Sequence, residues 1–490
     1  MNEVTPPLLD WVSDQDRFCA NAMLRAVSAT ALVKHRPAMR QTIRPVRGSI
    51  LASPAMDAYD PKPDYFFHWL RDSAIVADSL RESIEGAMLG PSAIEHLVDF
   101  VGFSLKLCRL DGPDFLREGL YPEAVEPSFQ EHVRSRVEIA KIVGDAVFGE
   151  GRYNPDGSLD VLKWSRPQND GPALRALAVM RFFALDAFRA RAGDAAMTLL
   201  RHDLDYTLSY LWERCYDLWE ENIGFHYHTR LVQQAALDAG AKFLAAAGDA
   251  ERAAACVAAA SELLAELDRH FDPEDGVYRG RLVETGSNAP LERRLDIAVV
   301  LAVIHAGRRA GAHSVVDPKM LATLFALERL FDEEYPINRA RPAACAPALG
   351  RYRGDSYFSG GAYYFATLGG AQFCFLLAQA VAEGESVLVT EGSRPPLAEL
   401  LQTPADTLLQ GALAENLREA LAVAALRRGD MYLATVRRFT PASRELAEQF
   451  SQQDGAPTSA DDLTWSYACF VTACAARRRA VQAMRAAHAT

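Results

Sequence analysis

The sequence predicts an all-α fold: pairs of helices that close into a ring, an α/α barrel whose loops gather at one end. Apolar residues recur at helical spacing through about a dozen segments, many of them roughly 15–25 residues long. Loops richer in Gly, Pro and aromatic residues join these segments, and strand-like alternation is rare, as at residues 431–436. Helix–loop–helix units recur along most of the chain. A stacked solenoid is the alternative, although it usually shows a clearer period.

Capping and turn residues support individual helices. Asp170 as N-cap and Pro172 in the first turn explain one helix start, and two acids at 461–462 explain another. The best linker-like stretch, residues 336–350, is followed by the same helical pattern, so we expect one domain over residues 1–490. The predicted helices cover residues 16–31, 70–88, 93–110, 171–190, 194–214, 230–247, 249–271, 295–309, 318–331, 360–382, 404–428 and 460–476.

Composition and charge narrow the class of protein. The 490 residues are 49% hydrophobic and 24% charged, as in globular proteins, and their formal net charge is −12. This acidic balance argues against nucleic acid or an anionic membrane as a partner, so we expect a small neutral ligand. We find no apolar run of about 18 residues that would span a membrane, and residues 1–7 lack the basic start and apolar core of a secretory signal.

Cysteine and histidine usage predicts a reducing compartment and no metal site. The eight cysteines are scattered without a CxxC pair, which favours free thiols over structural zinc or disulfides. His226 and His228 are two residues apart, a spacing that does not converge on a metal from a helix, so we expect structural roles for them. These features predict a soluble, cytoplasmic protein that needs no cofactor.

The first candidate functional loop, residues 64–73, opens a predicted helix. Arg71 and Asp72 follow the aromatic residues Tyr65 and Trp69. Because an Arg donates in a fixed fork and an Asp only accepts, the pair can bracket neighbouring hydroxyls of a ligand. The alternative is an ordinary helix N-terminus, with Asp72 favouring the dipole and Arg71 in a surface ion pair. Taken alone, the segment favours that alternative.

The second loop, residues 164–176, gathers planar polar groups around an indole. Trp164, Arg166 and Gln168 precede the predicted helix cap, and no structural requirement explains them there. We interpret this group as the floor of a ligand site.

Two later loops are less specific. In residues 350–361, glycines let the backbone approach a ligand that Arg351 and Asp355 could bind, with Tyr357 in the same loop, but a plain salt-bridged loop is equally plausible. Near the end of the chain, Glu448 by default lies on a solvated helix face, and Trp465 by default belongs to the core.

The most informative segment is residues 216–222, where three carboxylates crowd around Trp219. Apolar walls and a like charge raise the pKa of a carboxyl group, so Glu220, beside Trp219 and Glu221, is placed to keep a proton. An aromatic ring also suits the C–H face of a sugar. Taken alone, this segment supplies only half of a reaction, so the question is whether the rest of the chain supplies the other half.

Taken together and in this order, these segments resemble the glucoamylases of glycoside hydrolase family 15. The specific motifs are Trp-x-Arg-Pro-Gln-x-Asp-Gly-Pro-Ala-Leu-Arg-Ala at 164–176 and Asp-Leu-Trp-Glu-Glu at 217–221, and the likeness runs from residues 9–11 to 462–468. The resemblance implies an (α/α)6 barrel with its active site in a pocket at one end. It also implies inverting release of β-D-glucose from the non-reducing ends of α-1,4-linked gluco-oligosaccharides or glucans. No starch-binding module and no secretion signal are apparent, so we expect the substrate to be a short soluble oligosaccharide or a glycogen fragment inside the cell.

The resemblance also implies roles for single residues. Glu220 resembles the general acid, and Glu448 the general base, because the spacing of seventeen from Glu448 to Trp465 matches the family better than a base at Glu445. Inversion needs about 6.5–9.5 Å between two such carboxyl groups. The residues expected to bind substrate are Tyr65, Trp69, Arg71, Asp72, Trp164, Arg166, Trp219, Glu221, Arg351, Asp355, Tyr357 and Trp465.

Departures from the family pattern leave the linkage preference open. Gly354 stands where fungal enzymes usually carry a glutamate, and Ala362-Tyr363 replaces Pro-Trp, near the expected second sugar site. The alternatives within the family are enzymes for isomaltose or dextran ends, or for trehalose. A non-catalytic regulatory barrel is a more distant alternative, against which the presence of both Glu220 and Glu448 argues.

Overall fold

The computed structural model describes residues 7–58, 61–282 and 294–488. Residues 1–6, part of the segment in which the sequence shows no secretory signal, lie outside the described residues. The chain divides into two compact units. Unit 1 comprises Met1–Cys19, Leu264–Asp461 and Cys469–Thr490, and unit 2 comprises Ala20–Leu263 and Asp462–Ala468. The single domain expected from the sequence stays a prediction.

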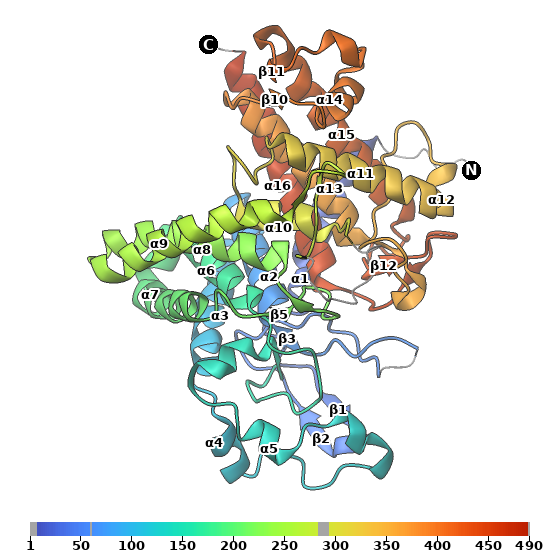
Figure 1. Cartoon of the computed structure of the whole chain (residues 1–490). Helices are drawn as coiled ribbons and strands as arrows, with labels where there is room; N and C mark the ends of the chain where they lie inside the picture. The colour runs from blue at the N-terminus through green and yellow to red at the C-terminus, as the bar shows by residue number, and fades with distance from the viewer. Residues whose placement is uncertain (1–6, 59–60, 283–293, 489–490) are drawn as a thin grey trace. The chain divides into compact units, whose positions relative to one another are not determined.

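Unit 2 is built on helices that pack around α6 (Figure 1). Helix α6 (Asp170–Phe182) packs against α2 (Leu70–Glu85), α7 (Asp186–Ser209) and α8 (Tyr227–Ala246), and α3 (Ile94–Leu107) packs against α7. Gly171 lets α6 approach α2 closely, because a Cβ there would lie 2.6 Å from Leu70 Cβ. This close approach brings the first turns of α2 and α6 together.

Unit 1 is organised around the pair α13 (Tyr364–Ala382) and α15 (Glu415–Phe439). A Cβ on Gly370 would lie 2.7 Å from the Tyr432 ring, and one on Gly429 would lie 2.3 Å from Phe375. Each helix therefore offers a glycine to an aromatic side chain of the other, which allows close packing. Helices α10 (Ala298–Ala306) and α14 (Arg394–Leu401) pack against α13 and α15 respectively, and α11 (Pro318–Glu334) contacts both α10 and α14.

The strands are short and all pairings are antiparallel. A three-stranded sheet has the order β13 (Pro457–Thr458), β12 (Gln449–Phe450), β9 (Ala362–Tyr363). The two-stranded pairs are β1 (Lys34–Arg36) with β2 (Gln41–Ile43), β3 (His68–Trp69) with β4 (Arg152–Tyr153), β5 (Cys215–Tyr216) with β6 (Ile223–Gly224), β7 (Phe271–Asp272) with β8 (Val277–Tyr278), and β10 (Leu388–Val389) with β11 (Gly411–Ala412).

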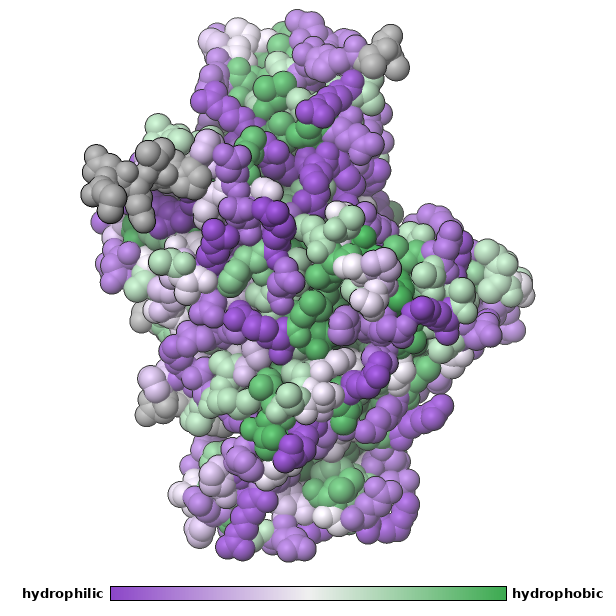
Figure 2. All heavy atoms as spheres, turned by 180° about the vertical axis from the view of Figure 1, so that it is seen from behind, coloured by the Kyte–Doolittle hydropathy of each residue, from purple (hydrophilic) through white to green (hydrophobic). Residues whose placement is uncertain are grey.

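The remaining α-helices are α1 (Leu8–Met23), α4 (Gly112–Arg117), α5 (Arg136–Ile139), α9 (Ala250–Leu267), α12 (Pro336–Arg339) and α16 (Thr464–Ala487). On the face drawn in Figure 2, hydrophobic side chains lie in small groups among hydrophilic ones. Large apolar residues that are exposed include Leu409, at 81% exposure, and Trp212, at 40%.

Several expectations from the sequence need correction. The predicted helices 16–31 and 404–428 have other bounds, because α1 spans Leu8–Met23 and α15 begins only at Glu415. The strand-like stretch 431–436 lies inside α15, because buried positions 421, 425, 429, 432 and 436 keep helical spacing through it. The predicted helix 171–190 ends at Phe182, and a new helix begins at Asp186. Contrary to our expectation, α13 is long and apolar enough to cross a membrane by length and composition, yet 89% of that stretch is buried inside the protein, as in a core helix.

Candidate active site

Within unit 2, the first candidate loop ends in a strand and a helix start. Trp69 closes β3 and pairs with Arg152 of β4, and α2 begins at the next residue. Arg71 and Asp72 therefore lie in the first turn of α2, as predicted. The Arg71 side chain is only 4% exposed, so the alternative of a surface ion pair is wrong.

Arg71 is the centre of a buried polar network. Its Nη1 donates to Asp170 Oδ2 at 3.0 Å and to Gln168 Oε1 at 3.2 Å, and its Nη2 donates to Glu220 Oε1 at 3.2 Å. Asp72 Oδ2 lies 3.8 Å from Arg71 Nε. Burial raises the pKa of Asp72 to about 6; Arg71 opposes the rise, while the Glu220 and Asp170 carboxylates add to it.

The start of α6 differs in detail from the prediction. Asn169, not Asp170, is the N-cap, and Asp170 is the first helical residue. The Asp170 carboxylate accepts from Arg71, and the Asn169 side chain accepts from the Tyr206 hydroxyl at 2.7 Å. The crowding of polar groups ahead of α6 is thus explained by this buried network.

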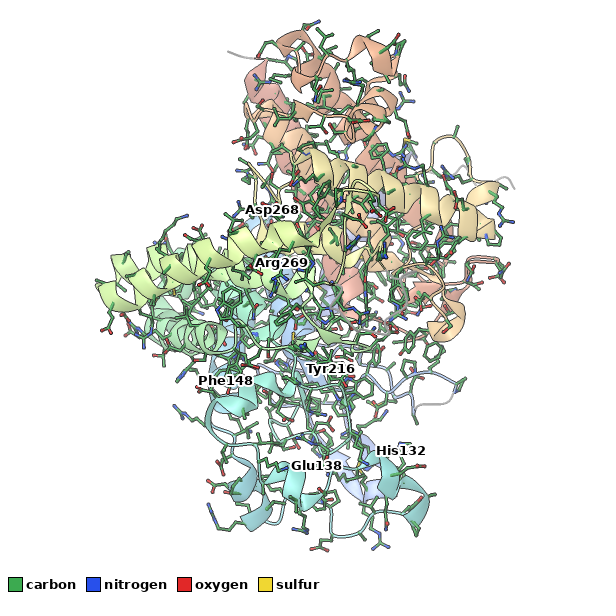
Figure 3. All side chains as sticks on the ribbon, viewed as in Figure 1. His132, Glu138, Phe148, Tyr216, Asp268 and Arg269 are labelled. Atoms are coloured by element: carbon green, nitrogen blue, oxygen red, sulfur yellow. The ribbon has the colours of Figure 1, made fainter. Side chains whose placement is uncertain are left out.

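Glu220 stands in the turn of the β5–β6 hairpin, four residues after Tyr216, which Figure 3 labels. Asp217 shapes the turn: its Oδ1 accepts from the Glu221 backbone N–H at 2.9 Å, and its backbone N–H donates to Asn222 O at 3.0 Å. Glu220 itself adopts φ 65°, a left-handed conformation that is uncommon for a residue with a side chain. Such conformations concentrate at functional sites.

Four described N–H groups donate hydrogen bonds to the Glu220 carboxylate. The Glu220 side chain is 13% exposed. Oε1 accepts from Trp69 Nε1 at 2.7 Å, from Gln168 Nε2 at 2.8 Å and from Arg71 Nη2 at 3.2 Å. Oε2 accepts from Trp164 Nε1 at 2.5 Å. The two oxygens are therefore unequal, because Oε1 takes three donors and Oε2 takes one.

An aromatic wall stands beside this carboxylate. Tyr65 meets Trp69 edge-on at 5.4 Å between ring centroids, and Trp69 meets Trp164 edge-on at 6.2 Å. The guanidinium of Arg152, fully buried, lies 3.7 Å from the Trp164 ring centroid and 5.1 Å from that of Trp69. Arg152 Nε donates to Asp160 Oδ2 at 2.7 Å. This buried cation supports both indoles that donate to Glu220.

Arg166 shares a hydrogen-bond partner, Asp160, with Arg152. Its Nε donates to Glu150 Oε2 at 2.8 Å, its Nη2 to Asp160 Oδ2 at 2.9 Å and its Nη1 to Leu162 O at 3.1 Å. These bonds explain Arg166 as a scaffold residue, and its contact with substrate stays a prediction.

Three other predicted site residues belong to unit 2. Trp219 is half-buried and Glu221 is exposed on the hairpin turn. Trp465 is buried in the first turn of α16, next to Thr464, whose hydroxyl donates to Leu51 O at 2.8 Å. Their predicted contacts with sugar remain predictions.

Unit 1 carries the other predicted residues. Arg351 and Asp355 form a buried two-bond ion pair, with Arg351 Nε to Asp355 Oδ2 at 2.7 Å and Nη2 to Oδ1 at 2.5 Å. The Tyr357 backbone N–H donates to Asp355 Oδ1 at 2.9 Å, and its ring centroid lies 5.3 Å from the Arg351 guanidinium. Gly354, the departure from the family pattern, has φ 72° and open space where a Cβ would lie.

Glu448, in unit 1, is 8% exposed, so the interpretation as a solvated helix face is wrong. It directly precedes β12, and its backbone N–H donates to Ala460 O at 2.8 Å. The Ser459 hydroxyl donates to Glu448 Oε2. Tyr363, the second departure, is buried in β9, and its hydroxyl accepts from Gln449 Nε2 at 2.8 Å.

Sequence reasoning missed several members of these networks. Ser459 was not predicted, although a hairpin pairing residues 449 and 458 would have placed it opposite Glu448. Gln168 and Asp170 were not predicted as partners of Arg71. His228, predicted as structural, is buried with its Nδ1 3.7 Å from Asp170 Oδ2, and burial lowers its pKa to about 3.

Metal ligation has no support among the described side chains, where no three His, Cys, Asp or Glu residues gather as a metal site would require. All eight cysteines are free thiols.

Comparisons with known proteins bear on the family and the fold of this chain. The family model of glycosyl hydrolases family 15 matches residues 136–475. Glucoamylase-1 of Schizophyllum commune is 30% identical over 448 residues, covering 89% of this chain and 70% of that protein. Glucoamylase 1 of Rhizopus oryzae is 28% identical over 456 residues, covering 89% of this chain and 68% of that protein.

Comparison with solved structures supports the same family. The solved family 15 glucoamylase from Hypocrea jecorina aligns with a TM-score of 0.77 and 25% identity, covering 96% of this chain and 72% of that one. The predicted (α/α)6-barrel class is thereby confirmed. The family match covers more than half of the chain, so this protein belongs to family 15 of the glycosyl hydrolases.

Proposed function

We propose that this protein is an inverting, exo-acting α-glucoside hydrolase of glucoamylase type. It releases β-D-glucose from the non-reducing ends of α-1,4-linked gluco-oligosaccharides or glucans. Family membership and the relatives named glucoamylase support a glycoside hydrolase with a carbohydrate substrate. The observation in the structure that carries the proposal furthest is the unequal set of donors on Glu220.

Glu220 serves as the general acid. Among the described side chains, three N–H groups donate to its Oε1, whereas Oε2 accepts only from Trp164, so the remaining lone pair of Oε2 is the place for the proton. Once that proton passes to the glycosidic oxygen, the four donors stabilise the carboxylate that is left. The carboxyl group is thus prepared for the charge it gains in the reaction.

Glu448 serves as the general base that activates water. A base must be a carboxylate held in one orientation, and the Ser459 hydroxyl fixes its Oε2 by donating a hydrogen bond. The family's spacing between this glutamate and Trp465 supports the assignment over the exposed Glu445.

Arg71 and Asp72 bind hydroxyls of the terminal glucose. Arg71 is held rigid by Asp170 and Gln168, so it can present a fixed donor at little entropic cost. Asp72 adds an acceptor. Tyr65, Trp69 and Trp164 supply aromatic surface for the C–H faces of the sugar rings.

Alternatives within the family differ in linkage. The relatives compared above are named glucoamylases, which favours α-1,4 hydrolysis over isomaltose, dextran or trehalose hydrolysis. Rates of glucose release from maltose, isomaltose and trehalose separate these possibilities. A barrel without catalytic activity predicts no hydrolysis of any of them.

The role assignments are tested by Glu220→Gln and Glu448→Gln on maltose, with the exposed glutamates Glu213→Gln and Glu445→Gln as matched controls. General acid and base catalysis contribute about 10²–10⁴-fold each, so each active-site variant should lose at least about a hundredfold in kcat while remaining folded. Both controls should keep wild-type kcat. Wild-type turnover by purified Glu448→Gln, or a comparable loss in Glu445→Gln, would overturn the base assignment.

A further inference from the structure

Unit 2 contains an open pocket of about 490 Å³ whose lining is mostly charged. It lies around α5, on which Figure 3 labels Glu138. Six titratable side chains line it: Arg134, Glu138, Lys141, Glu150, Lys163 and Arg166. Its volume is within the range of pockets that take small ligands.

Three of these six charged side chains, those of Arg134, Glu150 and Arg166, are joined by hydrogen bonds to one another. Glu150 Oε2 accepts from Arg134 Nη1 at 2.6 Å and from Arg166 Nε at 2.8 Å. Glu138 accepts from the Ser135 backbone N–H and hydroxyl, each at 2.7 Å, in a capping box at the start of α5. The carboxylates of Glu138 and Glu150 therefore already accept hydrogen bonds within the protein, and these bonds hold one wall of the pocket in place.

Two cations of the pocket have no such partner. Lys141 and Lys163 are exposed, and within the described chain neither ammonium group makes an ion pair or a side-chain hydrogen bond. Lys163 nevertheless acts on the pocket electrostatically, since it helps to lower the pKa of Glu138 after the hydrogen bonds from Ser135. Both lysines can turn toward a ligand without breaking an existing contact.

The lining of the pocket has a positive net charge, although the net charge of the whole chain is negative. Four cationic and two acidic side chains give the lining a net charge of +2, on a chain whose net charge is −12. A phosphate monoester carries about −1.5 to −2 charges near neutral pH, which complements this lining better than a single carboxylate does. Trp164, Ile142 and Ala146 supply an apolar wall that suits the C–H face of a sugar.

We infer that this pocket binds a phosphate-bearing saccharide, with its phosphate between Lys141 and Lys163 and a sugar ring against Trp164. The inference goes beyond the proposed hydrolysis and rests on residues outside the Glu220 network, apart from Trp164. That indole lines the pocket and also donates to Glu220 Oε2, so the ligand contacts a side chain that holds the acid. The phosphate comes either from a free sugar phosphate or from a phosphorylated glucan.

Titration calorimetry and kinetics test the pocket with two probes. The first is glucose 6-phosphate, compared with glucose, and the second is maltohexaose carrying a phosphate monoester, compared with plain maltohexaose. The variant is Lys141→Gln combined with Lys163→Gln, and the matched control is Lys242→Gln, an exposed lysine on α8. Hydrolysis of maltose by each protein is measured separately, so failure of the proposed function is distinguishable from failure of the pocket.

We expect the double variant to lose about tenfold in phosphate-dependent affinity or kcat/KM, while Lys242→Gln matches wild type. A loss confined to glucose 6-phosphate binding supports the inference with a free sugar phosphate as ligand. A loss confined to kcat/KM for phosphorylated maltohexaose supports it with a phosphorylated glucan. Wild type that does not distinguish either probe from its neutral counterpart, or a double variant that treats both probes as wild type does, overturns it.

Discussion

Replacing Trp164 with phenylalanine tests whether the donors around Glu220 set its chemistry. The indole N–H is the only described donor to Glu220 Oε2, at 2.5 Å. Phenylalanine removes that N–H but keeps an aromatic ring near the Arg152 guanidinium and the Trp69 edge. The change therefore acts on the hydrogen bond more than on packing.

The size of the effect follows from the bond that is lost. A hydrogen bond to a charged group is worth about 1.5–3 kcal/mol. The carboxylate forms as the proton leaves, so this bond strengthens toward the transition state and its loss appears mainly in kcat. Since about 1.4 kcal/mol is a factor of ten in rate, kcat should fall between about tenfold and about a hundredfold.

The assay is steady-state glucose release from maltose, with circular dichroism and a urea melt to confirm folding. Trp212→Phe is the matched control, because Trp212 is a partly exposed indole of the same unit and makes no described bond to Glu220. It should keep wild-type kcat. A folded Trp164→Phe protein with kcat within a factor of two of wild type would refute the reasoning.

Three further predictions concern single side chains. Ser459→Ala removes the hydrogen bond to Glu448 Oε2, so kcat on maltose should fall about fivefold with KM unchanged; an altered KM with unchanged kcat would argue for a role in binding. Arg152→Met breaks a buried ion pair with Asp160 and should lower the free energy of unfolding in urea by about 3 kcal/mol, whereas an unchanged midpoint would contradict the support it gives the indoles. Burial raises the pKa of Asp16 to about 6, so the folded state keeps a proton that the unfolded chain loses near pH 4, and stability falls as pH rises from about 4 to about 6. Asp16→Asn should remove about 3 kcal/mol of that fall, while exposed Asp10→Asn should not, and equal pH slopes in both would contradict the assignment.

The sequence predicted the local chemistry of the site better than its connections. Arg71 and Asp72 were recognised as a polar pair at a helix start, and Glu220 as a carboxyl group that Trp219 and Glu221 place to keep a proton. The bonds that join them through Gln168 and Asp170 depend on how closely α2 and α6 approach, which Gly171 decides. Such long-range contacts leave no periodic signal in the chain.

Other misses have the same origin. The pattern at 431–436 alternates like a strand, but its burial against α13 follows helical spacing, which only the whole of α15 reveals. Ser459 lies opposite Glu448 because β12 and β13 pair, and two-residue strands are too short to predict from alternation. Arg166 was predicted to contact the ligand because its true partners could not be recognised from the sequence. These partners, Glu150 and Asp160, come from a preceding loop.

The anomeric form of the first glucose released from maltotriose tests the central claim most directly, because the other product of the first cleavage is maltose and the released glucose comes only from the non-reducing end. Proton NMR within the first minutes, before mutarotation, distinguishes the two anomers. If Glu220 acts as acid and Glu448 directs water to the opposite face of the sugar ring, the initial product is β-D-glucose, which then converts toward the equilibrium mixture. Initial release of α-D-glucose would mean retention of configuration, and it would contradict both the role of Glu448 and the inverting mechanism.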